Sequence, residues 1–234
     1  MRTLFLLFVG LISWAGNTNA QSKINFLEAN LAFMRPTGFL SRNIQQTKVG
    51  FEAGYLRQLK LEKPLFWGLS IYYHPINNAT ATIQEVLDFD LVNFDYQTTS
   101  NLLGFNGKMR FYPDLNLGKL ELYVEAQLGY KWFFSSKYKT LTNDQEASDS
   151  SIEKGSLSLT YGASGGINFP VSDHLYLNFR ANYLPGLSTS YYVRNDSNTL
   201  SFSTIELFDL KKSTTDIIRW DLGVTWKLPN SDDE

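Results

Sequence analysis

The sequence contains no cysteine, which excludes a disulfide framework, a thiolate metal site and a lipid anchor on cysteine. Histidine is scarce as well, since only His74 and His174 occur. Basic residues are no more frequent than acidic ones, and the net charge of −2 gives no reason to expect a nucleic-acid partner. No spacing of acidic residues or histidines matches a metal-binding motif, so we expect neither a metal nor a cofactor.

A long apolar run is also missing. The run Leu4–Trp14 follows the basic Arg2 and is shorter than the roughly 20 residues of a membrane-spanning helix. Together with the small residue Ala20 it is typical of a secretory leader that is cleaved after export. A chain without apolar helices can cross a membrane only as a closed β-barrel, because lipid cannot satisfy open strand edges. We therefore divide the chain into a cleaved signal peptide, a barrel and a short polar tail: residues 1–20, 21–230 and 231–234.

The stretch Leu120–Trp132 alternates strictly between two kinds of side chain. Every second residue from Leu120 onward is apolar, whereas the residues between them include Glu121, Glu125 and Lys131. A period of two places the two sets on opposite faces of a β-strand. The pattern recurs along the chain and predicts eight strands: Ile24–Arg35, Lys48–Leu59, Leu65–His74, Asn101–Tyr112, Leu120–Trp132, Leu157–Phe169, His174–Leu184 and Ile217–Leu228.

Short and long connections alternate between these strands. The second and third, fourth and fifth, and sixth and seventh strands are joined by tight turns rich in Pro, Asn, Asp and Gly. The other four connections are long and polar: Pro36–Thr47, Asn77–Ser100, Ser135–Ser156 and Pro185–Asp216. Short periplasmic turns and long extracellular loops are typical of bacterial outer-membrane barrels, and an even number of strands places both termini in the periplasm.

The faces expected to point outward exclude charge. From the third strand to the eighth no charged residue falls on them, as expected where lipid penalises a charge by roughly 2–4 kcal/mol at mid-bilayer. Aromatic residues near the strand ends suggest two girdles at the membrane interfaces: Trp67, Phe111, Phe169 and Trp226 on the turn side, and Tyr73, Trp132, Tyr183 and Trp220 on the loop side. The sequence thus favours an all-β, antiparallel up-and-down transmembrane barrel, most simply with eight strands. A soluble barrel would need its apolar residues inside.

The pattern over Ile24–Leu228 resembles that of the small eight-stranded outer-membrane barrels, the OmpA-type and OmpX-type group within the broad porin family or outer-membrane β-barrel domain family. The last strand, with Trp220 and Trp226, is similar to the alternating aromatic strand that the barrel-assembly machinery recognises in such proteins. It departs from the usual form because Lys227–Glu234 follow. The resemblance implies a monomer in the outer membrane, in contact with its lipid and lipopolysaccharide.

The inward faces carry charges of both signs, and eight strands enclose an interior that side chains just fill. Since an unpaired buried charge is strongly destabilising, we expect a structural network of Glu28, Glu52, Lys108, Arg110, Glu121, Glu125, Lys131, Arg180, Arg219 and Asp221. Between the fourth and fifth strands we expect Lys108 opposite Glu125 and Arg110 opposite Tyr123. Such a network would plug the lumen. The alternative is a small porin-like channel for ions or solutes.

A lipid-modifying enzyme is the second alternative. It would need adjacent Ser, His and acidic side chains within about 3 Å, which the spacing around His74 and His174 does not suggest. We therefore expect no enzyme activity. An acidic group in the second long connection matches no calcium loop and is expected in solvent: Glu85, Asp88, Asp90 and Asp95.

The last long connection predicts a hairpin. Tyr191–Arg194 and Leu200–Leu207 flank Asn195-Asp-Ser-Asn, a typical turn sequence. Two further membrane strands, giving ten, are the alternative, but Lys211 and Lys212 would fit poorly in lipid. Long loops held on one side of a scaffold tend to carry function. We therefore expect a surface anchor, interaction or structural protein whose loops contact a surface protein or host ligand.

Overall fold

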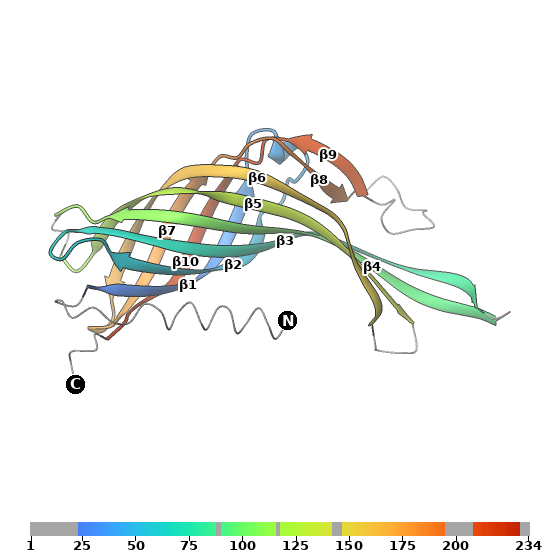
Figure 1. Ribbon diagram of the computed structural model, residues 1–234, viewed down its shortest axis with the longest axis horizontal. Helices are drawn as coiled ribbons and strands as arrows, with labels where there is room; N and C mark the ends of the chain where they lie inside the picture. Colours follow the sequence, from blue (N-terminus) through green and yellow to red (C-terminus); the bar gives the residue numbers. More distant parts are fainter. Residues whose placement is uncertain (1–22, 88–89, 116–117, 142–146, 195–207, 230–234) are drawn as a thin grey trace.

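The computed structural model describes residues 23–87, 90–115, 118–141, 147–194 and 208–229. Eight antiparallel strands close into a barrel in the order β1–β10–β7–β6–β5–β4–β3–β2 (Figure 1). The barrel strands are β1 (Asn25–Pro36), β2 (Lys48–Gln58), β3 (Leu65–Leu87), β4 (Asp90–Phe111), β5 (Glu121–Leu141), β6 (Ala147–Pro170), β7 (Leu175–Leu184) and β10 (Ile217–Lys227). The predicted eight-stranded, antiparallel up-and-down barrel is confirmed.

A second, two-stranded sheet lies outside the barrel wall. It consists of β8 (Thr189–Arg194) and β9 (Phe208–Ser213), which pair with each other and not with the barrel strands. The alternative of ten membrane strands is therefore wrong. The predicted first strand of this hairpin, Tyr191–Arg194, lies in β8, whereas the predicted second strand, Leu200–Leu207, falls outside the described residues. The predicted leader, residues 1–20, and the polar tail, 231–234, also fall outside them.

The two ends of the barrel are built differently. Short links join β2 to β3, β4 to β5 and β6 to β7 at one end, the turn end, where Phe26 of β1 pairs with Lys227 of β10. At the other end, the loop end, the link between β1 and β2 contains a short 3-10 helix, η1 (Leu40–Arg42), with Leu40 buried. The β8–β9 sheet also lies at the loop end (Figure 1). No helix in the described ranges is long and apolar enough to cross a membrane.

Two strand pairs continue past the loop end instead of giving way to loops. β3 and β4 remain paired out to Leu87 and Asp90, and β5 remains paired with β6 as far as Thr140 and Ala147 (Figure 1). The connections 77–100 and 135–156, predicted as polar loops, are therefore mostly strand. The reason is that β pairing needs extended backbone and β-branched or aromatic residues, which these segments contain, and does not need an apolar outer face.

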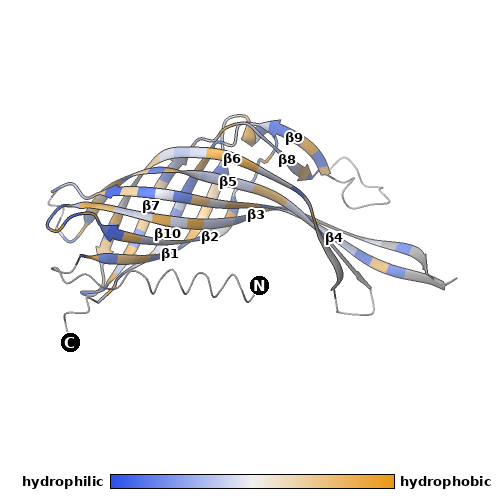
Figure 2. Ribbon diagram, in the orientation of Figure 1, coloured by the Kyte–Doolittle hydropathy of each residue, from blue (hydrophilic) through white to orange (hydrophobic). Residues whose placement is uncertain are grey.

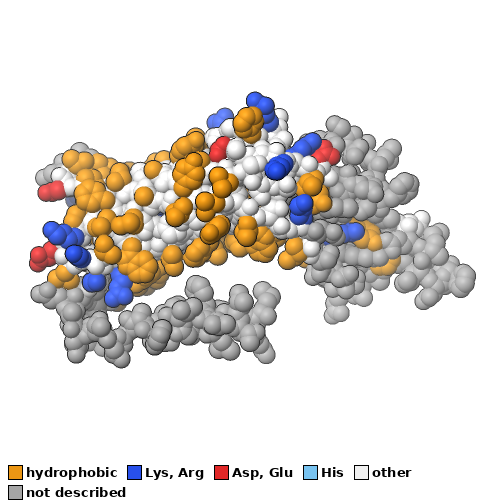
Figure 3. Space-filling view, turned by 45° about the horizontal axis from the view of Figure 1, so that its top comes forward, with side chains coloured by type: hydrophobic (Ala, Val, Ile, Leu, Met, Phe, Trp, Pro, Cys, Tyr) orange, Lys and Arg blue, Asp and Glu red, His pale blue; other side chains and the backbone are white. Residues whose placement is uncertain are grey.

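Buried and exposed residues alternate along the barrel strands within the described residues, as the sequence predicts. In Figure 2 the ribbon of these strands changes repeatedly between hydrophilic and hydrophobic residues. In β1, buried Glu28 and Asn30 alternate with exposed Leu27 and Leu31. Large apolar side chains cover the outer wall, and the charged side chains visible on the face in Figure 3 gather toward its two ends. An apolar surface of this extent is unfavourable in water and suits the hydrocarbon layer of a membrane.

Candidate functional site in the barrel lumen

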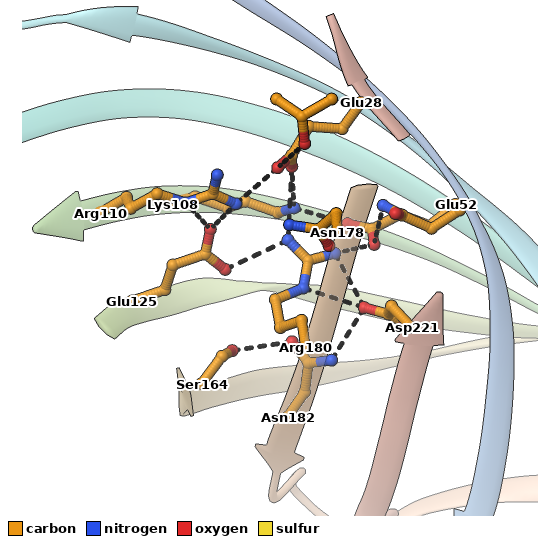
Figure 4. Close-up of polar contacts among 12 residues, drawn as sticks. Glu28, Glu52, Lys108, Arg110, Glu125, Ser164, Asn178, Arg180, Asn182 and Asp221 are labelled. Carbon is orange, nitrogen blue, oxygen red and sulfur yellow. Dashed lines mark hydrogen bonds and ion pairs between the residues drawn. The ribbon is translucent and has the colours of Figure 1, made fainter. Parts of the chain in front are cut away.

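Eight charged side chains from six strands meet inside the barrel, and Figure 4 labels all of them except Arg219. We call them the lumen charge cluster: Glu28, Glu52, Lys108, Arg110, Glu125, Arg180, Arg219 and Asp221. Four are acidic and four are basic, so the cluster is neutral as a whole. Each of these eight side chains forms at least one ion pair, and none of them is exposed to solvent. Charges buried in this way are tolerated only when they are paired and hydrogen-bonded.

Two cations of β4 connect opposite sides of the wall. The Lys108 ammonium lies 2.5 Å from Glu52 Oε1 and 3.3 Å from Glu28 Oε2. The Arg110 guanidinium donates from Nη2 to Glu28 Oε1 at 2.6 Å and from Nε to Glu125 Oε2 at 2.7 Å. These contacts join β4 to β1, β2 and β5. They fix the strands to one another in addition to the backbone ladder.

Arg180 of β7 lies at the centre of the cluster. Its guanidinium donates to Asp221 Oδ2 from Nε at 3.0 Å and from Nη2 at 2.8 Å, and it also forms an ion pair with Glu52. Nη1 lies 3.3 Å from both Glu28 and Glu125. A guanidinium has five N–H donors and can bridge several carboxylates at once, which a lysine in this place could not do with the same geometry.

Arg219 closes the cluster on the β10 side. Its Nε donates to Asp221 Oδ1 at 2.8 Å, and its Nη2 lies 3.1 Å from Glu52 Oε2. Each carboxylate of the cluster therefore meets at least two cations.

Neutral polar side chains complete the cluster, and the sequence analysis did not single them out. Gln127 donates through Nε2 to Glu125 Oε1 at 3.1 Å and to Asn182 Oδ1 at 2.9 Å. Asn182 in turn donates to Asp221 Oδ2 at 2.8 Å, and Ser164 donates to Asn182 Oδ1 at 2.7 Å. All of them occupy inward positions of the alternating pattern, which is the signal that could have revealed them.

Two tyrosine rings flank the cluster, each held between a glycine and an arginine. Tyr72 lies directly opposite Gly104 in the β3–β4 ladder, and the Arg219 guanidinium carbon lies 4.2 Å from the centre of its ring. Tyr123 lies directly opposite Gly166 in the β5–β6 ladder, and Arg110 lies 3.9 Å from its ring centre. In both cases a Cβ on the glycine would overlap the ring. The glycines thus create the space that brings each ring against an arginine.

Apolar clusters lie on both sides of the charges. At the turn end, Phe26, Leu56 and Phe66 pack together, with Tyr112 and Tyr176 against them. At the loop end, a larger group contains residues of the barrel wall, the β1–β2 link and β8: Met34, Leu40, Ile44, Tyr72, Ile76, Leu102, Phe133, Leu184, Tyr191, Val193 and Ile217. We call these the turn-end seal and the loop-end seal.

Two residues predicted for the network do not join it. Glu121 is exposed at the turn end, where β5 begins, so its carboxylate lies at the mouth of the barrel and not among the buried charges. Lys131 is buried, but its ammonium donates to the backbone carbonyls of Leu184 and Thr215, both at 2.6 Å. The predicted register of the β4–β5 hairpin is also wrong, because Arg110 lies opposite Glu125 and Lys108 opposite Gln127.

Among the described residues, neither histidine has the adjacent Ser and acidic side chains that a catalytic triad needs. His74 is fully buried near the loop end, and neither of its ring nitrogens has a hydrogen-bond partner among the described residues. His174 precedes β7 at the opposite end. In the described part of the chain no group of three or more His, Asp and Glu side chains could hold a metal ion. Of the acidic group predicted in solvent, Asp95 accepts a hydrogen bond from Thr82 at 2.6 Å, and the side chains of Glu85, Asp88 and Asp90 fall outside the description.

The aromatic residues predicted for the girdles all lie on outward positions of the wall. Five are exposed and three are half-buried: Trp67, Phe111, Phe169, Tyr183 and Trp226, and Tyr73, Trp132 and Trp220. That they mark the two lipid interfaces stays a prediction.

A closed antiparallel barrel with an apolar outer wall and a charged, internally bonded lumen satisfies the requirements of a membrane-spanning β-structure. The chain forms a barrel of the outer-membrane type. No protein-family model and no curated protein matches its sequence.

Several solved structures of outer-membrane proteins are similar to the chain at low sequence identity. A major outer membrane protein from Thermus thermophilus is 12% identical, with 89% of this chain and 100% of that chain covered and a TM-score of 0.49. Neisserial surface protein A is 12% identical, with 90% and 100% covered and a TM-score of 0.42. The outer membrane protein OprG from Pseudomonas aeruginosa is 14% identical, with 90% and 98% covered and a TM-score of 0.42.

Proposed function

We propose that the protein anchors a protruding β-structure on the outer surface of the outer membrane, where this structure contacts other molecules. The observation that carries the proposal is the asymmetry of the barrel. The paired extensions of β3–β4 and β5–β6 and the β8–β9 sheet all lie at the loop end, whereas the turn end has only short links. A membrane scaffold needs only turns, and elaborate connections kept on one side tend to carry function. On this proposal the turn end and both termini face the periplasm.

The β8–β9 sheet is suited to this role because the barrel holds it in place. The Tyr191 ring lies 5.2 Å from the Phe133 ring, and its hydroxyl is bonded to Asn43 at 2.8 Å and to Ser213 at 2.6 Å. Ser100 of β4 also donates to the backbone carbonyl of Tyr192 at 3.0 Å. A surface that is ordered before binding loses little conformational entropy when a partner arrives.

We further propose that the lumen is plugged and that the barrel does not conduct. Support comes from the lumen charge cluster, whose side chains bridge opposite walls without solvent exposure, and from the apolar seals at both of its ends. An ion entering this interior would have to separate buried pairs of opposite charge, and a buried charge left without its partner is strongly destabilising.

The orientation can be tested with epitope tags. A tag inserted after Leu141, at the far end of β5, is expected to bind antibody on intact cells, and a tag at the carboxyl terminus only after the outer membrane is permeabilised. The opposite labelling pattern contradicts the proposed topology.

The role of the β8–β9 sheet can be tested by replacing residues 186–212 with Asn-Gly. Because Tyr191 and Val193 belong to the loop-end seal, folding of the shortened barrel must first be verified by its heat-dependent migration in gels. We expect a folded barrel whose cells no longer adhere to immobilised serum and matrix proteins. A folded barrel that leaves adhesion intact contradicts the assignment of the contacts to this sheet.

A further inference from the structure

A groove opens on the outer wall where β2 and β3 separate. Their pairing ends with Phe51 opposite Tyr73, and β3 then continues with β4 past an irregularity between Pro75 and Asn77. The groove has a volume of about 530 Å³ and is bounded by the start of β2 and by the outer faces of β3, β4 and β5. It lies outside the lumen and is separate from the charge cluster.

Three aromatic side chains from β3 and β5 line the groove. Tyr73 and Phe134 each pack against an outward aromatic neighbour: the ring centres are 5.5 Å apart for Tyr73 and Phe51, which lie opposite each other in the β2–β3 ladder, and 4.7 Å apart for Phe134 and Trp132. Tyr138 adds a third ring that is exposed. These rings present flat apolar faces together with hydroxyl groups.

Amide side chains of β3 and β4 lie among these rings. Asn101 is bonded within the wall, because it accepts from the Tyr73 hydroxyl at 2.7 Å and donates to Thr99 at 3.1 Å. Asn78 and Gln97 are exposed, and their side-chain amides have no hydrogen-bond partner in the described part of the chain. An amide offers both donors and an acceptor, as recognition of hydroxyl groups requires.

The groove lies where the outer wall changes from apolar to polar. Along the outward face of β4, Phe105 and Leu103 are followed by Asn101, Thr99 and Gln97 in the direction of the loop end. Such a change marks the level at which acyl chains give way to lipid headgroups. The residues that line the groove are therefore placed to meet the headgroup of a lipid, with its chains along the aromatic wall below.

We propose that this groove binds the sugar headgroup of a glycolipid in the outer leaflet. Sugars present apolar ring faces to aromatic side chains and hydroxyl groups to amides, and the groove supplies both. Among the described residues that line it, Lys48 is the one cation, and its ammonium lies 3.3 Å from Gln46 Oε1. A site that recognises the phosphate groups of a lipid alone would need a cluster of cations. Because the groove opens on the lipid-facing wall, the source of the sugar is a membrane lipid and not a soluble glycan.

The proposal can be tested by titrating the detergent-solubilised protein with lipid A and counting bound lipid by native mass spectrometry. The test variant is Gln97→Ala/Tyr138→Ala, which changes two residues that lie opposite each other on the rim. The matched control is Tyr183→Ala, another exposed outward tyrosine, on β7. We expect one lipid A bound to the unaltered protein and to the control. In the double variant we expect affinity to fall by about tenfold or more.

Three results would overturn the proposal. Phosphatidylglycerol bound as tightly as lipid A would show that the sugar is not recognised. A deacylated lipid A headgroup bound as tightly as lipid A would show that the ligand need not come from the membrane. Equal losses in Tyr183→Ala and in the double variant would place the binding elsewhere on the wall. Asn78→Ala, a single exposed substitution, provides a second test should the double variant fail to fold, and it is expected to weaken lipid A binding in the same direction.

Discussion

The guanidinium of Arg180 on β7 forms an ion pair with the carboxylate of Glu52 on β2, although β1 and β10 separate these two strands in the barrel wall. The pair therefore crosses the lumen. Lys108 and Arg219 bind the same carboxylate from β4 and β10, so three cations from three strands depend on Glu52. Ion pairs of this kind connect strands on opposite sides of the lumen. Backbone hydrogen bonds, in contrast, connect only neighbouring strands of the wall.

Replacing Glu52 by Ala is expected to lower the free energy of unfolding by about 3–5 kcal/mol, because it leaves buried cations without a partner. The matched control is Glu121→Ala, which removes an exposed carboxylate of β5 outside the cluster and is expected to change stability by less than about 0.5 kcal/mol. Urea unfolding in lipid vesicles measures both. Equal and small losses would mean that the lumen charges do not stabilise the barrel.

The folded protein is expected to give no large, ion-selective current steps in planar bilayers. The seals at the turn end and the loop end leave apolar residues on either side of the charges, and the charges neutralise one another. Single-channel recording over a range of voltages checks this. Stable conductance steps from purified, folded protein would contradict the plug and favour the porin-like alternative.

The inward faces could be predicted from sequence because a period of two leaves no ambiguity about which residues share a face. The register of β4 against β5 could not be predicted in this way. Lys108 was expected opposite Glu125, whereas Arg110 occupies that place. A shift of two residues keeps every side chain on its face, so the alternating pattern cannot detect it, and only the geometry of the link between β4 and β5 decides.

Two other predictions from the sequence differ from the structure: the loops that are strand extensions and the place of Lys131. The sequence predicts loops for the β3–β4 and β5–β6 extensions because these connections are long and polar, yet β pairing does not require lipid on either side. Lys131 was assigned to the charge network from its inward position alone. Its ammonium lies nearer the loop end, where it donates to the backbone carbonyls of Leu184 and Thr215 instead of pairing with a carboxylate of the cluster.

Gly104→Ala is expected to destabilise the barrel by roughly 1–3 kcal/mol, since a new Cβ would collide with the Tyr72 ring, which Arg219 prevents from moving away. Gly165→Ala is the matched control, because nothing lies within 4 Å of its added Cβ on the outer face of β6. Heat-dependent gel migration and urea unfolding report both. A loss in Gly165→Ala as large as in Gly104→Ala would show that the glycines matter through backbone freedom and not through the tyrosine ring.

Lipid contact of the outer wall can be tested with one substitution made at two places. Leu222 of β10 is 53% exposed near the middle of the wall, where it lies between Leu31 and Phe179, and Leu210 of β9 is 50% exposed in the sheet outside the barrel. Leu222→Arg is expected to lower the free energy of unfolding in vesicles by about 2–4 kcal/mol, because a charge in the hydrocarbon layer must be desolvated. Leu210→Arg is expected to have little effect, since its neighbours Lys211 and Lys212 are already exposed cations. If both substitutions are tolerated equally in vesicles, the exposed apolar wall is not in contact with lipid.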